Sequence, residues 1–151
     1  MRAEIHRSVA ALAAWYETLT PESLARVGEH YAANAWFKDP FNEVGGLDAI
    51  RRVFAHMFET LEEPRFRVLE RVVNDEAALL TWEFSFRLRG RELQVRGASH
   101  LKYNGRGKLV YHRDYWDTAE ELYAKLPLVG ALMRWLRRRL SASRQKSRGI
   151  R

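Results

Sequence analysis

The chain has 151 residues, of which 46% are hydrophobic and 12% aromatic, enough to build one globular domain with a core and a lined cavity. The absence of cysteine excludes a disulfide framework and a thiolate metal site, and the five histidines show no His-x-x-x-His spacing. We therefore expect neither a metal nor another cofactor.

The net charge of +7 comes from one end of the chain. Residues 134–151 hold eight of the 26 Lys and Arg residues and no acid, which leaves 18 basic and 19 acidic residues elsewhere, a charge of −1. Any electrostatic partner, an anionic membrane surface or a nucleic acid bound weakly, is therefore expected at this basic tail. No apolar run approaches the length of a membrane span, and no cleavage pattern follows the first apolar run, so we expect a cytoplasmic protein.

The N-terminal part of the sequence predicts two helices. Over residues 5–19 apolar side chains recur at spacings of three and four, and the face that they form includes Tyr16. Thr20 and Pro21 match the N-cap and first position of a second helix. That helix is expected to run to Tyr31 and to turn its ring inward.

A short strand is predicted over residues 35–39, ended by Pro40. Because strand side chains alternate between faces, Asp39 lies on the same face as Phe37, the apolar one. Two interpretations are open: an Asp-Pro pair that opens a turn with a solvated side chain, or a carboxylate in an apolar cleft. In the second case burial raises the pKa of the acid, which becomes a usable general base near neutral pH.

After this strand the pattern is first helical and then alternating. A Gly45-Gly46 pair precedes a third amphipathic helix, which includes Phe54 on its apolar side and is closed by Pro64. Period-two alternation then predicts strands over residues 66–73, 80–89, 94–102 and 109–117. The result is a meander of long antiparallel strands.

The turn sequences fix which residues of this meander are neighbours. If Gly90-Arg91 and Gly105-Arg106 are the central turn residues, three rows of side chains cross the apolar face. These rows are Trp82, Ser99 and His112; Phe84, Gly97 and Asp114; and Phe86, Val95 and Trp116. A glycine in mid-strand often marks close approach or empty space, so the concave face is expected to open into a cavity at Gly97.

Residues 119–140 predict a C-terminal helical extension interrupted at Pro127. Its second part carries an apolar stripe that includes Leu136 and Leu140, with arginines on the rest of the surface. Either the stripe packs on the domain, or a basic amphipathic helix contacts anionic lipid or nucleic acid. The last residues, 141–151, are expected to be a disordered basic tail.

Short motifs in this order resemble a known family. They are Tyr31-Ala32, Asp39-Pro40-Phe41, Ala49-Ile50 and Tyr115-Trp116. Together with three helices and the meander, they resemble the nuclear transport factor 2-like superfamily, in its SnoaL-like and ketosteroid-isomerase-like branch. The resemblance covers about residues 8–118 and implies a SnoaL-like domain over 1–118. It also implies an α+β cone: three N-terminal helices on a strongly curved, mostly antiparallel sheet around an internal pocket, plus a C-terminal helix.

The resemblance implies roles for single residues. Asp39 matches the general base of the steroid isomerases, Tyr16 the tyrosine of their oxyanion hole, and Trp116 an aromatic pocket wall. The carboxylic acid of that oxyanion hole falls on Ser99, and a supporting tyrosine falls on Phe54. A pair of hydroxyls could still polarise a carbonyl, so the departure argues for slower or different chemistry.

His112 and Asp114 lie on one face, two residues apart, beside Ser99 in the expected register. Alternate residues of a strand are separated by about 7 Å, too far for a direct His-Asp hydrogen bond without side-chain bending. There is also no nucleophile elbow, so a Ser-His-Asp hydrolase is disfavoured. Two interpretations remain: pocket-lining polar groups with Asp114 as a second acid or base, or a buried hydrogen-bond network.

The predicted site has a polar and an aromatic part. The candidate catalytic residues are Asp39, Tyr16, Ser99, Asp114 and His112, and the candidate ligand-binding residues are Phe37, Phe54, Trp82, Phe84 and Trp116. We expect proton transfer of the isomerase or cyclase type on a small apolar carbonyl or enol ligand. The alternative is a non-catalytic ligand-binding or dimerisation module.

The opposite face of the sheet carries charges of both signs. The basic residues are Arg87, Arg89, Arg96, Lys102 and Arg113, interleaved with Glu83 and Glu92. This mixture favours a solvated or dimer-forming surface over a nucleic-acid face. The resemblance implies a homodimer formed through the sheet.

Overall fold

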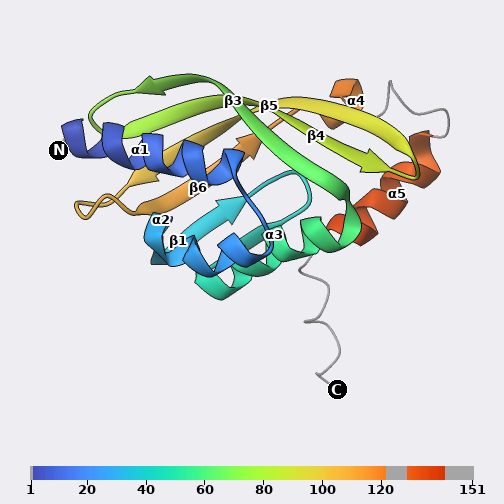
Figure 1. Ribbon diagram of the computed structural model, residues 1–151, viewed down its shortest axis with the longest axis horizontal. Coiled ribbons are helices and arrows are strands. Elements are labelled where there is room, and N and C mark those ends of the chain that lie inside the picture. Colours follow the sequence, from blue (N-terminus) through green and yellow to red (C-terminus); the bar gives the residue numbers. More distant parts are fainter. Residues whose placement is uncertain (1, 122–128, 142–151) are drawn as a thin grey trace.

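The computed structural model describes residues 2–121 and 129–141 and has an α+β architecture (Figure 1). The helices are α1 (Arg2–Glu17), the 3-10 helix η1 (Glu22–Arg26), α2 (Val27–His30), α3 (Leu47–Thr60), α4 (Thr118–Glu121) and α5 (Val129–Leu140). The strands are β1 (Tyr31–Lys38), β2 (Glu43–Gly45), β3 (Glu62–Val73), β4 (Ala77–Leu88), β5 (Arg91–Tyr103) and β6 (Leu109–Tyr115).

The strands form one sheet in the order β2-β1-β6-β5-β4-β3. Every neighbouring pair is antiparallel except β1 and β6, which run parallel. Register shifts within β3 and at the end of β5 bend the long strands. Helices α1 and α3 lie on the same side of the sheet in Figure 1, and α5 lies beside α3. The predicted fold, a curved sheet covered by N-terminal helices with a C-terminal helix, is confirmed.

The second predicted helix is the first correction. Its residues form the 3-10 helix η1 and the single turn α2, and Tyr31 begins strand β1 instead of ending a helix. Leu24, Val27 and Tyr31 are all buried, so their spacing of three and four residues fits a helix although the backbone changes to strand. Pairing with β6 holds the segment extended, since Tyr31 lies opposite Leu109. The short strand β2 was not predicted either.

The first hairpin of the meander differs from its predicted register by two residues. Leu88 pairs with Arg91, so the central turn residues are Arg89 and Gly90, with φ of 51° and 76°. Two successive positive φ values are typical of the tight turns that match strand twist. Consequently Trp82 lies opposite Gly97 and not opposite Ser99.

The second hairpin is displaced as well. Its loop is longer than predicted, because the Asn104 side chain accepts hydrogen bonds from the N–H groups of Arg106 and Lys108. Ser99 then lies opposite Asp114, and His112 opposite Leu101. Because both displacements equal two residues, every side chain keeps its predicted face while its neighbours across the strands change.

Gly97 marks a close approach and not the opening of a cavity. A Cβ atom at this position would lie 2.5 Å from Cη2 of Trp82 and 2.9 Å from the carbonyl oxygen of Tyr115. The indole ring therefore fills the space that a side chain at residue 97 would occupy, and the mid-strand glycine is required by packing.

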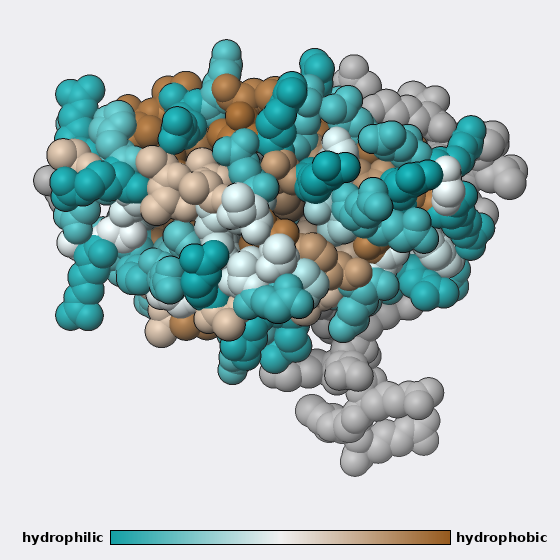
Figure 2. Space-filling view, in the orientation of Figure 1, coloured by the Kyte–Doolittle hydropathy of each residue, from teal (hydrophilic) through white to brown (hydrophobic). Residues whose placement is uncertain are grey.

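The outward face of the sheet is largely hydrophilic but carries some apolar residues. The exposed large hydrophobic residues are Leu69, Val72, Leu79 and Tyr115. In Figure 2, hydrophobic residues gather along the upper edge of the molecule, where the long strands lie in Figure 1. Glu83, predicted to be solvated, is instead buried, because Arg67 and Arg96 cover it at 3.1 and 2.8 Å. Among the described residues, no helix is both long enough and apolar enough to cross a membrane.

The end of α5 packs on the domain. Leu136 is 1% exposed, and the guanidinium of Arg89 lies 4.9 Å from the ring centre of Trp135. Thr60 donates a hydrogen bond to the carbonyl oxygen of Arg139 at 3.5 Å, whereas the arginine side chains 137–139 are exposed. In this half of the helix the packed-stripe interpretation holds. The predicted break at Pro127 and the predicted disorder of residues 142–151 lie outside the described residues.

Candidate functional site

A cavity of about 100 Å³ lies between the concave face of the sheet, the loop after β1, and helices α3 and α5. Its described lining is apolar and aromatic apart from two acids and one amide. The residues are Phe37, Asp39, Phe41, Asn42, Val53, Phe54, Met57, Leu61, Phe66, Trp82, Phe84, Val95, Asp114, Trp116 and Leu140. The size suits a ligand of a few heavy atoms.

Asp39 combines the two roles that the sequence left open. It follows β1 and opens a turn, since its Oδ1 accepts hydrogen bonds from the N–H groups of Phe41 at 2.8 Å and Asn42 at 2.6 Å. The Asn42 amide also contacts Oδ1 at 3.2 Å and Oδ2 at 3.3 Å. The same carboxyl group lines the cavity. Oδ2 is therefore the oxygen with spare lone pairs among the described contacts.

The environment of Asp39 raises its pKa from 3.8 to about 6. Burial is the largest cause, and the charge of Asp114 adds to it. The hydrogen bonds from Phe41 and Asn42 act in the opposite direction and offset part of the rise. At pH 7 the carboxylate is thus mostly ionised but is a far stronger base than an ordinary aspartate.

Asn42 connects this turn to the C-terminal helix. The residue is buried, and its side-chain amide donates a hydrogen bond to the carbonyl oxygen of Leu140 at 3.1 Å. Leu140 also lines the cavity. The described end of α5 is therefore part of the cavity wall next to Asp39.

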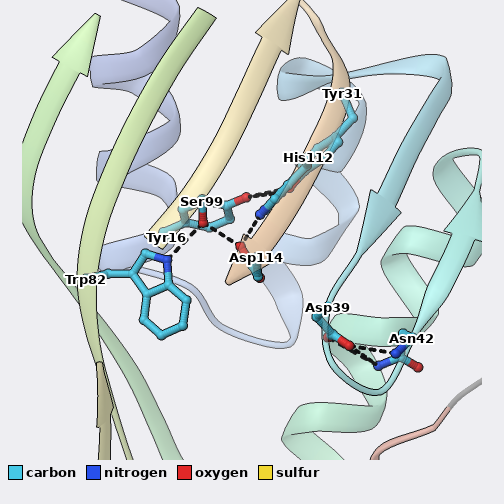
Figure 3. A network of polar contacts seen from close by, with 8 residues as sticks. All are labelled: Tyr16, Tyr31, Asp39, Asn42, Trp82, Ser99, His112 and Asp114. Atoms are coloured by element: carbon cyan, nitrogen blue, oxygen red, sulfur yellow. Dashed lines mark hydrogen bonds and ion pairs between the residues drawn. The ribbon is translucent and has the colours of Figure 1, made fainter. Parts of the chain in front are cut away.

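A second group of polar residues lies deeper under the sheet (Figure 3). It is a continuous hydrogen-bond network of Tyr16, Tyr31, His112, Asp114, Ser99 and Trp82. In Figure 3 Asp39 and Asn42 form a separate pair near the loop, and no hydrogen bond drawn there joins them to the network. The cavity thus has two differently built polar ends.

His112 is the centre of the network and is 2% exposed. Its Nδ1 lies 2.6 Å from the hydroxyl of Tyr31 and 3.0 Å from that of Tyr16, and the two hydroxyls also hydrogen-bond to each other. Its Nε2 lies 2.6 Å from Oδ1 of Asp114. Burial raises the pKa of both tyrosines well above the usual value, which keeps them protonated donors.

Asp114 is where the hydrogen bonds converge. Its Oδ1 accepts a 2.5 Å hydrogen bond from the hydroxyl of Ser99, which itself accepts one from Nε1 of Trp82 at 2.9 Å. In one assignment of protons, the Tyr16 hydroxyl donates to that of Tyr31, the Tyr31 hydroxyl donates to Nδ1 of His112, and Nε2–H of His112 donates to Asp114. Only the Ser99 hydroxyl and the His112 Nε2–H then donate to the Asp114 carboxylate directly.

The direct His112–Asp114 contact is the case that the sequence-based estimate allowed only with side-chain bending. Their backbones are separated as expected for alternate strand residues, but the two side chains lean toward each other. Tyr31 was missed as a network residue because it was assigned to a helix. The neighbours of Asp114 could be found only from the actual register, which brings Asp114 directly opposite Ser99. A carboxyl group, that of Asp114 on the neighbouring strand, thus lies beside Ser99.

The structure divides the predicted site residues between two spaces. Seven line the main cavity: Phe37, Asp39, Phe54, Trp82, Phe84, Asp114 and Trp116. Three others, Tyr16, Ser99 and His112, line an adjoining void of about 10 Å³, room for a single water molecule at most. The hydroxyls of Tyr16 and Ser99 are engaged within the network. Phe41, Asn42 and Leu140 of the main cavity were not predicted.

In the part of the chain that the structure describes, no group of three or more His, Asp or Glu side chains is placed to hold a metal ion.

A six-stranded curved sheet, helices over its concave face and a cavity between them define a cone of the nuclear transport factor 2-like type. The family model described as "SnoaL-like domain" matches residues 12–112, so the chain belongs to this family. The match ends before Asp114 and Trp116 and excludes α5. Among proteins with curated descriptions, none matches this sequence.

Solved structures with the same fold share little sequence with the chain. A ketosteroid-isomerase-like protein from Catenulispora acidiphila, in complex with trimethylamine, is 19% identical over 80% of this chain and 93% of its own, with a TM-score of 0.67. A putative SnoaL-like polyketide cyclase from Jannaschia is 12% identical over 79% and 89%, with a TM-score of 0.68. An M. tuberculosis epoxide hydrolase described as LEH-like is 14% identical over 80% of this chain and 87% of its own, with a TM-score of 0.65. At these identities the likeness concerns the fold.

Proposed function

We propose that the protein is an enzyme of the isomerase or cyclase type, in which Asp39 transfers a proton on a small carbonyl or enol ligand. The observation that carries the proposal is a carboxyl group with a pKa of about 6 on the wall of an aromatic cavity. A base is most effective when its pKa lies near the working pH, and burial provides this shift for Asp39.

In the proposed reaction, Oδ2 of Asp39 removes a proton from the carbon next to the carbonyl group. The C–H electron pair becomes the new C=C bond, and the carbonyl π electrons move to oxygen, which gives an enolate. The protonated Asp39 then returns the proton to another position, or the enolate carbon attacks a second carbonyl within the ligand and closes a ring. In the second case the π electrons of the attacked carbonyl move to its oxygen, which takes the proton from Asp39. Oδ1 stays in the turn with Phe41 and Asn42, so the carboxyl group keeps its orientation.

Two features support this role for Asp39. The described cavity wall around it is apolar, which limits access of bulk water to the base. A putative polyketide cyclase is among the structural neighbours, and trimethylamine in complex with another supports small ligands for this fold.

The test uses a panel of small enones and β-diketones in deuterated water. NMR measures how fast the protein exchanges their C–H protons for deuterium. We expect exchange with the unmodified protein and its loss in Asp39→Asn, because the amide keeps the shape but is a poor base. Asp48→Asn is the matched control, since Asp48 is an exposed acid on α3 paired with Arg51. Undiminished exchange by Asp39→Asn would remove Asp39 as the base.

The second candidate is a ligand-binding module without chemistry. It is favoured by the number of contacts that Asp39 makes within its own turn and by the engagement of the Tyr16 and Ser99 hydroxyls in the network. In that case ligands bind, but neither the unmodified protein nor Asp39→Asn exchanges their protons.

A further inference from the structure

We infer that the ligand of this cavity carries a small alkylated ammonium group. The inference rests on the proposed use of the cavity as a ligand site and names the class of ligand. It comes from the charges, the aromatic rings and the hydrogen-bonding state of the lining residues.

The described charges that line the cavity have one sign. Among the described residues that line it, Asp39 and Asp114 are acidic and none is Lys, Arg or His. The two carboxyl groups repel, since the charge of Asp114 raises the pKa of Asp39. The exposed arginines of α5 are not among the lining residues. A cation bound between the two acids would remove this repulsion.

The rest of the wall is aromatic. Its rings are Phe37, Phe41, Phe54, Phe66, Trp82, Phe84 and Trp116. Several meet edge to face, such as Phe41 and Trp116 with ring centres 5.6 Å apart at 64°. Aromatic faces attract cations, and a cage of rings with nearby carboxylates is the arrangement that proteins use for quaternary ammonium groups.

The hydrogen bonds of the two acids favour an alkylated amine over a primary one. Oδ1 of Asp39 is taken by the turn, and Oδ1 of Asp114 by His112 and Ser99. A primary ammonium group has three N–H donors to satisfy, and the rest of the lining is mainly hydrocarbon. A methylated ammonium group needs few or no acceptors and buries its methyl groups against the rings. The volume of about 100 Å³ suits such a compact group.

A cationic ligand also fits the proposed proton transfer. An enolate that forms beside the carboxylate of Asp114 would meet a like charge, and the hydroxyls of Tyr16 and Ser99 are already engaged. An ammonium group within the ligand would offset the negative charge that develops on its own carbonyl oxygen.

The experiment compares choline with 3,3-dimethylbutan-1-ol, in which carbon replaces the charged nitrogen. Binding is measured by titration calorimetry and by NMR shifts of the indole N–H groups at pH 7.5. We expect choline to bind at least tenfold more tightly than the neutral alcohol. Equal affinity for the two compounds, tighter binding of the alcohol, or binding of neither overturns the inference.

Variants locate the effect. Asp39→Asn and Asp114→Asn should each weaken choline binding about tenfold or more and leave the alcohol unchanged, with the fold checked by circular dichroism. Asp48→Asn removes an exposed acid and should bind like the unmodified protein. An unchanged affinity for choline in both Asp39→Asn and Asp114→Asn would contradict the proposed site.

The pH dependence provides a measurement that needs no variant. Asp39 is surrounded by Asp114 of β6, by the Asn42 amide of its own loop and by apolar residues of α3. The Asn42 amide also donates to the carbonyl oxygen of Leu140 at the end of α5. Ionisation of Asp39 should strengthen choline binding as the pH rises through about 6. A flat profile between pH 5 and 8 would count against the inference.

The two proposals fail in different ways. If choline binds and depends on the acids but no carbonyl compound exchanges its protons, the ligand class stands and the proton transfer falls. If neutral ketones exchange and choline does not bind, the proton transfer stands and the ammonium ligand falls.

Discussion

The two carboxyl groups of the cavity show how differently one residue type can be held. Asp114 receives its hydrogen bonds from His112 on its own strand and from Ser99 on the neighbouring strand, and His112 is held in turn by tyrosines of α1 and β1. Asp39 instead receives its hydrogen bonds from its own turn. The first carboxylate is fixed by the tertiary structure and the second by local sequence. A change in the network that holds Asp114 should therefore affect stability most, and a change at Asp39 should act mainly on titration and ligand binding.

The largest effect is expected from His112→Leu, which removes the centre of the network. The substitution leaves the Asp114 carboxylate without its 2.6 Å donor and the two tyrosine hydroxyls without an acceptor nitrogen. Buried groups without partners cost about 1–3 kcal/mol each, so we expect a loss of roughly 3–5 kcal/mol in the free energy of unfolding. Urea denaturation measures it, with His6→Leu on the exposed side of α1 as control. A loss below about 1 kcal/mol would show that the network is not structural.

A smaller effect is expected from Asp39→Asn, and it depends on pH. The pKa of Asp39 is higher in the folded protein, about 6, than the ordinary value of 3.8, so folding favours the protonated acid. The stability from this group is fully present below pH 4 and is lost as the pH rises through about 6, by up to about 3 kcal/mol. Asn cannot ionise, so the variant should lack this loss. Parallel stability curves from pH 4 to 7 would contradict the shifted titration.

The smallest effect is expected at the end of α5. Leu140→Ala shortens a half-buried side chain that lines the cavity and should cost about 1 kcal/mol, since the helix keeps Leu136 in the core. Thermal unfolding measures the difference, and Leu69→Ala, at an exposed site on β3, is the control. If the two variants lose equal stability, α5 contributes little to the cavity wall.

Sequence periodicity was sufficient for the faces of the sheet but not for its rows. Alternation places Trp82, Ser99 and Asp114 on the concave side whatever the turns do. The rows depend on whether Arg89-Gly90 or Gly90-Arg91 is the centre of a turn, and a non-glycine residue with positive φ is not visible in a pattern of hydrophobicity. Ser99, His112 and Asp114 were thus identified as polar groups on one face, while their contacts required the register.

Tyr31 and Leu140 were missed for a different reason. Tyr31 has helical spacing with its neighbours but is held extended by a strand from the other end of the chain. Leu140 lines the cavity because α5 packs beside α3. The hydrogen bond from Thr60 to the carbonyl oxygen of Arg139, for example, joins residues 79 positions apart in the sequence. Contacts between residues so far apart in the sequence cannot be predicted from a local pattern of residues.

The hydrogen bond from Asn42 to the carbonyl oxygen of Leu140 bears on how domain boundaries are chosen for this fold. A boundary placed where the family match ends, at residue 112, would separate Asp114, Trp116 and α5 from the sheet whose cavity they complete. A gene fragment cut there would encode most of the scaffold but only part of the site.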